Sequence, residues 1–298
     1  MSPVEPPVTS PTDLAAAYAA LADPVSAAGR ARPIAGGTDM MVALTGELGE
    51  PPAGVVDLWR LDALRGITLD GDVLVLGALT TYTDIRRSTT CGEHLPVLVE
   101  AAATIGAAQI QNRGTLGGNI ANASPAGDTL PVLLAADASF ILGSVRGERE
   151  ISAEAFWTGY RQTALAPDEL VLRVRIPLRS GREMRFRKVG TRRAQSISKV
   201  VLGLAWHDPG EQPDTTERPG PWRDVRLALG SVAATPIRAR ATEAVLEGRA
   251  PTPETAALAA TTLAHELQPI DDVRSTAEYR RLVAARIVHR LIREAGGW

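Results

Sequence analysis

Two short glycine-rich segments hold the residues of this 298-residue chain best suited to chemistry. The first reads Ala35-Gly36-Gly37-Thr38-Asp39, and the second reads Thr115-Leu116-Gly117-Gly118-Asn119. Glycine has no Cβ, so backbone N–H groups in such segments can approach a phosphate closely. One segment alone is most simply a tight turn, but two in one chain favour a phosphate-containing ligand. Neither matches GxGxxG or the Walker A lysine loop, so a Rossmann-type fold is not expected.

Side chains that could act as nucleophiles or metal ligands are sparse. The four histidines lack metal-ligand spacing, and the sequence contains neither HExxH nor GxSxG. Cys91 is the only cysteine, which excludes an iron–sulfur cluster or thiolate zinc site within the chain, and we expect a buried, inert thiol. Lys188 ends the basic run Arg185-Phe186-Arg187-Lys188, which is either a solvated edge strand or the position of a cation that faces phosphate or a reduced flavin.

The composition is that of a globular protein with no electrostatic signature. Hydrophobic residues make up 45% of the chain, and the formal net charge is −2. The sequence therefore lacks the excess of basic residues that is typical of nucleic-acid-binding proteins, and it lacks a polybasic segment that would bind a membrane surface. No apolar run is long enough for a transmembrane helix, and the N-terminal sequence does not resemble a secretory signal. We expect a cytoplasmic location.

Short elements must position the first glycine segment. Ser10 with Pro11 after it predicts the start of a helix that continues to Leu21. Residues 32–37 predict a short strand that breaks into a glycine turn. Either Thr38 or Asp39 could then cap a helix over residues 40–48.

Around the second segment the pattern predicts a sheet and further helices. Residues 66–79 read as a hairpin that turns at Asp70-Gly71. Residues 112–128 are too rich in Gly, Asn and Ser for a regular element. A helix is expected over 129–138, with Asp128 at or near its cap.

A linker at Pro177–Gly181 precedes a second α+β region. Three strands and then three helices are expected there, separated by a solvent loop at 208–222. The expected helices lie near 237–247, 253–267 and 274–294.

Residues 110–138 closely resemble the FAD-binding medium subunit of molybdenum hydroxylases, the family of the carbon monoxide dehydrogenase flavoprotein and the xanthine dehydrogenase FAD domain. Residues 33–42 are similar to the family's other FAD signature. Residues 186–201 resemble the opening of its C-terminal domain, and residues 230–246 and 271–292 resemble its later part. The resemblance covers nearly the whole chain, and the paired segments make it specific.

This resemblance implies an α+β chain with a two-subdomain FAD-binding fold of the vanillyl-alcohol-oxidase type. A C-terminal domain of a three-stranded antiparallel sheet and a helix bundle follows. The implied FAD-binding domain spans residues 1–178, with subdomains of about 1–58 and 59–178, and the implied C-terminal domain spans 182–298.

The resemblance also implies non-covalent FAD, since neither glycine segment contains a His or Cys for attachment. No side chain is expected to be catalytic, because the cofactor carries the redox chemistry. Lys188 would stabilise the reduced flavin. The implied cofactor-binding residues are Pro33, Ile34, Ala35, Gly36, Gly37, Thr38, Asp39, Met40, Ile105, Gly106, Thr115, Leu116, Gly117, Gly118, Asn119, Asp128, Leu172 and Lys188.

By the same resemblance, the chain is the electron-transfer subunit of an oxidoreductase complex. A large subunit would carry molybdopterin, and a small subunit would carry two [2Fe–2S] clusters. Electrons would pass from those clusters through FAD to an external acceptor. The three chains would form a dimer of heterotrimers. Two alternatives are a self-sufficient FAD oxidase of a small alcohol and a structural subunit without FAD.

Overall fold

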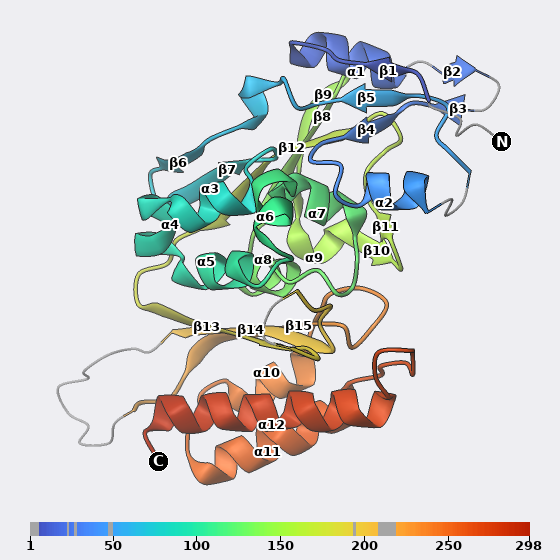
Figure 1. Ribbon diagram of the computed structural model, residues 1–298. Helices are drawn as coiled ribbons and strands as arrows, with labels where there is room; N and C mark the ends of the chain where they lie inside the picture. Colours follow the sequence, from blue (N-terminus) through green and yellow to red (C-terminus); the bar gives the residue numbers. More distant parts are fainter. Residues whose placement is uncertain (1–5, 23, 27–28, 47–49, 193–194, 208–218) are drawn as a thin grey trace.

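The computed structural model shows three larger sheets with helices between and below them, besides two-stranded pairings, within the part of the chain that it describes (Figure 1). A small N-terminal sheet lies at the top, and a five-stranded sheet with a layer of short helices lies beneath it. A third sheet, backed by three helices, forms the base. The structure describes residues 6–22, 24–26, 29–46, 50–192, 195–207 and 219–298.

The N-terminal sheet is parallel and has the order β1-β5-β4. Helix α1 (Leu14–Ala22) packs beside it through Ala17 and Leu21. This helix begins later than predicted, because the Asp13 carboxylate accepts a hydrogen bond from Ala16 N at 2.8 Å and caps it. The other elements are β1 (Val8–Thr9), β2 (Pro24–Ser26), β3 (Gly29–Arg30), β4 (Arg32–Ile34), α2 (Met40–Thr45) and β5 (Val55–Asp57).

The five-stranded antiparallel sheet has the order β6-β7-β12-β8-β9. The predicted hairpin is present: its turn contains Gly71 at φ +60, a value that glycine adopts without strain. One face of the sheet, including Leu170, packs toward α1, and the other face, including Val174, packs toward the helices. Its strands are β6 (Ile67–Asp70), β7 (Val73–Gly77), β8 (Ser139–Ser144), β9 (Gly147–Ser152) and β12 (Leu170–Pro177).

One short helix in the covering layer contradicts the sequence prediction. Helix α7 (Leu116–Asn122) occupies part of the segment predicted to be irregular. The Thr115 hydroxyl caps it by accepting from Gly118 N at 3.1 Å, a signal that the Gly-rich composition obscured. The remaining elements of this layer are η1 (Asp62–Leu64), α3 (Tyr82–Arg87), α4 (Thr89–His94), α5 (Pro96–Ala103), α6 (Ala108–Arg113), α8 (Leu130–Ala135), α9 (Ala153–Phe156), β10 (Trp157–Gly159) and β11 (Gln162–Thr163).

The C-terminal region contains the three predicted strands and a short fourth one, in the order β13-β14-β15-β16. Strand β14 (Val200–His207) is buried on both faces. Its Val201 and Ala205 join the core of the first region, beneath the five-stranded sheet, and its Leu202 and Leu204 join the core under the C-terminal helices. Part of the predicted loop, residues 208–218, lies outside the described residues. The other elements are β13 (Arg182–Val189), β15 (Arg223–Gly230), β16 (Ile237–Arg238), α10 (Arg240–Leu246), α11 (Pro253–Glu266) and α12 (Ala277–Gly296).

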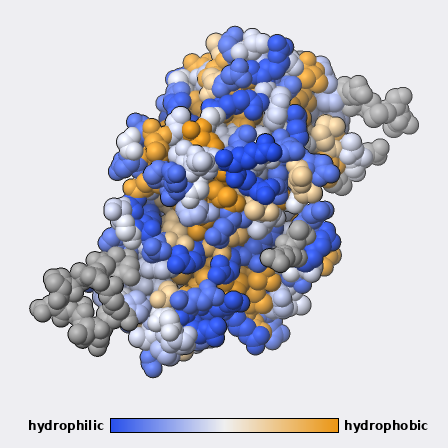
Figure 2. All heavy atoms as spheres, turned by 60° about the vertical axis from the view of Figure 1, so that its left-hand side comes forward, coloured by the Kyte–Doolittle hydropathy of each residue, from blue (hydrophilic) through white to orange (hydrophobic). Residues whose placement is uncertain are grey.

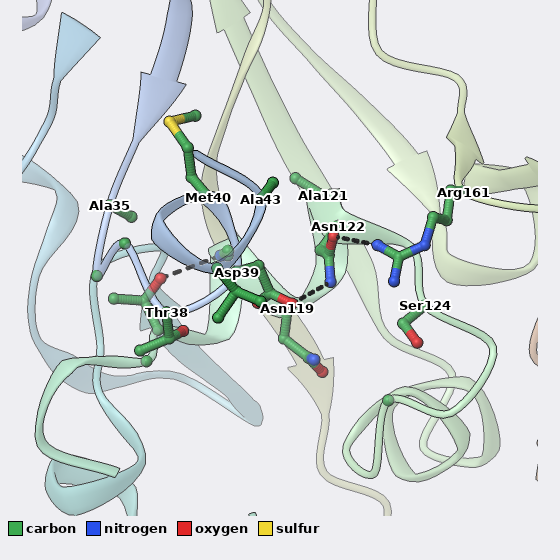
Figure 3. A pocket seen from close by; sticks show the side chains of 18 of the residues that line it. Ala35, Thr38, Asp39, Met40, Ala43, Asn119, Ala121, Asn122, Ser124 and Arg161 are labelled. Atoms are coloured by element: carbon green, nitrogen blue, oxygen red, sulfur yellow. Dashed lines mark hydrogen bonds between the residues drawn. The ribbon is translucent and has the colours of Figure 1, made fainter. Parts of the chain in front are cut away.

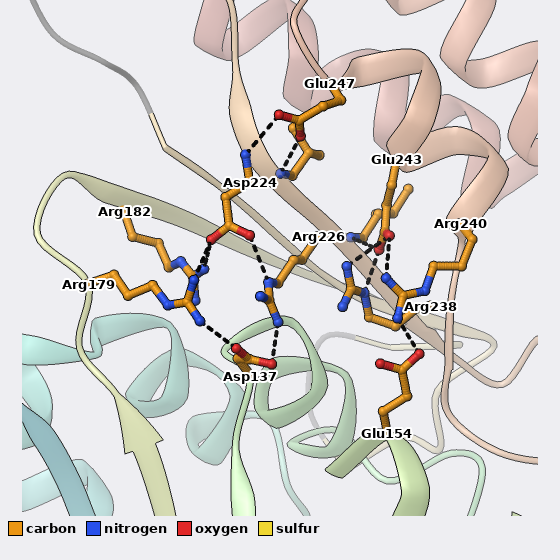
Figure 4. A network of polar contacts seen from close by, with 12 residues as sticks. Asp137, Glu154, Arg179, Arg182, Asp224, Arg226, Arg238, Arg240, Glu243 and Glu247 are labelled. Atoms are coloured by element: carbon orange, nitrogen blue, oxygen red, sulfur yellow. Dashed lines mark hydrogen bonds and ion pairs between the residues drawn. The ribbon is translucent and has the colours of Figure 1, made fainter. Parts of the chain in front are cut away.

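Ion pairs join the two regions beside the linker (Figure 4). Arg179 in the linker contacts Asp137, which follows α8, at 2.6 Å and Asp224 of β15 at 3.1 Å. Arg226 also pairs with both aspartates, and Arg182 pairs with Asp224. Asp137 of the first region is therefore tied to the linker through Arg179 and to the C-terminal sheet through Arg226.

The outer surface is mixed in character. On the face in Figure 2, hydrophilic residues cover much of the area and apolar residues lie between them. Among the helices that the structure describes, none is both long enough and apolar enough to cross a membrane.

Candidate functional site

Both glycine segments line one large cleft of about 2570 Å³. It extends from the N-terminal sheet, past the helix layer, to the loops of the C-terminal region. Most of the predicted cofactor-binding residues lie along it: Pro33, Ile34, Ala35, Gly36, Gly37, Thr38, Asp39, Met40, Ile105, Gly106, Thr115, Gly117, Gly118, Asn119 and Asp128.

The first glycine segment connects β4 to α2 and forms one wall of the cleft. Gly37 has φ +75, so the chain turns there in a conformation that favours glycine. The backbone N–H groups of residues 36–40 have no hydrogen-bond acceptor within the part of the chain that the structure describes. A run of consecutive free N–H groups in a turn is suited to binding an anion. The phosphate chemistry predicted from the sequence therefore fits this segment.

The N–H groups of the second glycine segment are hydrogen-bonded within the protein. Leu116 N donates to Thr80 O at 2.9 Å, and Gly117 N donates to Ala78 O at 2.9 Å. The next N–H group, that of Gly118, is taken by the Thr115 side chain. These N–H groups are therefore committed to protein acceptors, and the segment anchors α7 rather than offering donors to phosphate.

The two glycines of this second segment differ in their surroundings. A Cβ on Gly117 would lie 2.6 Å from Ala78 Cβ and 2.8 Å from Ala78 O, so this glycine allows α7 to pack against the end of β7. A Cβ on Gly118 would meet only the Thr115 hydroxyl, at 2.8 Å. Gly118 is half-buried and lines the cleft, so it is the glycine that leaves room for a ligand.

A chain of three polar side chains crosses this part of the cleft (Figure 3). Asn122 Nδ2 donates to Asp39 Oδ1 at 2.8 Å, and Arg161 Nη1 donates to Asn122 Oδ1 at 2.8 Å. The sequence prediction included Asp39 but missed Asn122 and Arg161. Asn122 lies three residues after Asn119 on α7, and this helical spacing is the signal that could have identified it.

Asp128 forms a second polar cluster, deeper in the cleft. Lys188 Nζ lies 2.5 Å from Asp128 Oδ2 and 3.0 Å from Thr104 O, and the Ser198 hydroxyl donates to Asp128 Oδ1. Burial raises the pKa of the Asp128 carboxyl, although Lys188 and the hydrogen bonds oppose this shift. Asp128 directly precedes Thr129, the N-cap residue of α8, in agreement with the expected position at or near the cap, and its carboxylate is occupied by Lys188 and Ser198.

Three predicted cofactor-binding residues do not line the cleft. Leu116 and Leu172 are buried in hydrophobic cores. On the same strand, Leu170 and Val171 line the cleft, whereas Leu172 packs into the core beside α1. Lys188 connects to the cleft through Asp128, which its ammonium group contacts directly.

Two family models match this chain, one after the other. Residues 3–179 match the FAD binding domain in molybdopterin dehydrogenase. Residues 186–295 match the CO dehydrogenase flavoprotein C-terminal domain.

Curated relatives and solved structures agree with these matches. The chain is 31% identical to the carbon monoxide dehydrogenase medium chain of Hydrogenophaga pseudoflava over 89% of each chain. It is 33% identical to the nicotine 6-hydroxylase medium subunit of Paenarthrobacter nicotinovorans, over 88% of this chain and 89% of the relative. The structure of carbon monoxide dehydrogenase from Hydrogenophaga pseudoflava superposes with a TM-score of 0.90 at 29% identity, covering 100% of this chain and 99% of that one. The chain therefore belongs to the family of FAD-binding medium subunits of molybdenum hydroxylases.

Proposed function

We propose that this chain holds FAD non-covalently in the cleft and passes electrons from a partner's iron–sulfur clusters to an external acceptor. The observation that carries the proposal is the run of five N–H groups, from Gly36 to Met40, that have no acceptor among the described residues. The diphosphate is the most negatively charged part of FAD, and these N–H groups are suited to bind it. When bound, FAD supplies the redox chemistry.

The rest of the cleft suits the remaining parts of an extended FAD molecule. Gly118 leaves space opposite the first glycine segment, and Asn119 lies beside it. Ile105 and Gly106 supply apolar and backbone surface near Asp128, where we place the flavin ring. Asp128, held by Lys188, would set the local charge at the ring.

The family assignment supports two partners, a large molybdopterin-binding subunit and a small subunit with [2Fe–2S] clusters. We also propose that two such heterotrimers pair, and that the complex is cytoplasmic. Within the chain we assign residues 1–178 to FAD binding, with subdomains of about 1–58 and 59–178, and residues 182–298 to the C-terminal domain. The end of β12 at Pro177 and the start of β13 at Arg182 support this division.

Native purification through a tag on this chain tests the proposal. We expect both partners to copurify with molybdenum, iron and one FAD per tagged chain. Acid precipitation should release the FAD into the supernatant. A lone flavoprotein that oxidises a substrate unaided would establish the oxidase alternative, and a colourless chain within the complex would establish the structural-subunit alternative.

A further inference from the structure

Asp39 lies in the middle of the proposed diphosphate loop, yet its side chain does not cap the helix that follows. It occupies the N-cap position of α2 with φ −100 and ψ −45, and among the described residues its carboxylate accepts no N–H from that helix. An Asp at this position usually accepts a hydrogen bond from an N–H group two or three residues later. Here Asp39 Oδ1 accepts instead from Asn122 Nδ2, 83 residues away in the sequence.

Asn122 is itself held from the opposite side. It is the last residue of α7, and its Oδ1 accepts from Arg161 Nη1 at 2.8 Å. Arg161 lies in the turn between β10 and β11 at φ +52, a conformation that costs free energy in a residue other than glycine. Figure 3 shows Asn122 between Asp39 and Arg161, with its amide nitrogen toward Asp39. The amide is therefore oriented by a donor on one side and an acceptor on the other.

We propose that Asn122 is a positioning residue that draws the Asp39 carboxylate away from the N–H groups of residues 36–40 and so keeps them available for the FAD diphosphate. The inference rests on the proposed function, which places the diphosphate on this loop. Without Asn122, the Asp39 carboxylate competes for these donors because it belongs to the same loop. Its negative charge also repels the diphosphate at short range.

The test measures FAD binding rather than turnover. The Kd and the release rate of FAD are determined by flavin fluorescence with the full-length chain, before and after FAD depletion. In N122A we expect Kd to rise about tenfold, the effect of losing one hydrogen bond to a charged group. In the double variant D39A/N122A we expect Kd to return close to the wild-type value, because the competing carboxylate is gone.

Asn112→Ala is the matched control. Asn112 is an exposed residue of α6 whose Oδ1 accepts from Thr83 Oγ1 at 2.6 Å, and it does not line the cleft. The same truncation there should leave the Kd for FAD unchanged. Thermal unfolding of each FAD-depleted variant reports on folding separately from binding.

The outcomes separate this inference from the proposed function. If N122A weakens FAD binding and the double variant D39A/N122A binds FAD equally weakly, Asn122 has a purely structural role and the inference is overturned. Gly37→Val tests the loop itself, because valine is strained at φ +75. If G37V weakens FAD binding and N122A does not, the inference alone fails. If neither variant changes the Kd, the diphosphate does not lie on this loop and both fail.

Discussion

The backbone of Gly36 lies directly against the carbonyl group of Arg113: a Cβ on Gly36 would be 1.8 Å from that oxygen. The side chain of Arg113 is fixed as well, because its guanidinium lies 3.8 Å from the centre of the Trp59 ring. The proposed diphosphate loop is thus in backbone contact with the end of α6, immediately before the second glycine segment. A side chain at Gly36 would separate the two glycine segments.

We therefore expect Gly36→Ala to lower the free energy of unfolding by about 1–3 kcal/mol, the usual cost of overpacking. FAD occupancy should fall in parallel. Urea unfolding and the ratio of flavin to protein absorbance measure the two effects. Gly92→Ala in α4 is the control, since a Cβ there meets no atom within 4 Å. A Gly36→Ala variant as stable as the wild type would show that the loops separate without cost.

The two glycines of the second segment should respond differently to alanine. Gly117→Ala places a methyl group against the Ala78 backbone, so it should lower the unfolding temperature of the chain even without FAD. Gly118→Ala places the methyl group at the cleft, 2.8 Å from the Thr115 hydroxyl and away from backbone atoms, so it should weaken FAD binding and lower the unfolding temperature of the FAD-depleted chain less than Gly117→Ala does. Calorimetry of FAD-depleted protein, followed by FAD titration, distinguishes these effects. Equal loss of stability in both variants would contradict the assigned roles.

Lys188 and Asp128 should shift the flavin midpoint potential in opposite directions. Lys188→Ala removes a positive charge that favours the reduced form, so the potential should fall; Asp128→Asn removes a negative charge, so it should rise. A difference of about 1.4 kcal/mol corresponds to about 30 mV for a two-electron couple. The double variant should lie near the wild-type potential, because the pair is removed together. Spectroelectrochemical titration measures all four proteins, and identical potentials would mean that the pair does not act on the flavin.

The thiol of Cys91 should be unreactive in the folded chain. Cys91 is fully buried, and burial raises the pKa of its thiol, although a hydrogen bond with Ser88 lowers it. A raised pKa means less thiolate at any given pH, and the thiolate is the reactive form. We expect reaction with Ellman's reagent only after denaturation, at pH 7 and also at pH 8.5. Rapid labelling of native protein at pH 7 would contradict this.

Much of the site could be predicted from sequence because its signals are local. Adjacent glycines between short elements indicate backbone that approaches a ligand, and the cleft does contain both segments. The strands of the large sheet were also predictable, since Leu74 and Leu76 alternate with less buried residues.

The sequence could not show which N–H groups remain free. The donors of Leu116 and Gly117 are taken by carbonyl groups of residues 80 and 78, a contact that depends on how α7 packs against the end of β7. Asn122 and Arg161 were missed for the same reason: the hydrogen bond between them joins two positions that are separated by 39 residues in the sequence. Leu172 does not line the cleft because its side chain packs into the core beside α1, a contact that its resemblance-based position does not reveal.

Strand β14 has a consequence for cooperativity. Its Val201 and Ala205 belong to one core, and its Leu202 and Leu204 belong to the other, so melting this strand removes residues from both. The two regions that separate family models recognise should therefore unfold in a single transition rather than in sequence. A fragment carrying residues 182–298 alone would expose Phe186, Val201 and Ala228 to water and should aggregate. A chimera that joins the first region of one relative to the C-terminal region of another would fold only if the residues that pack against β14 are compatible in the two proteins.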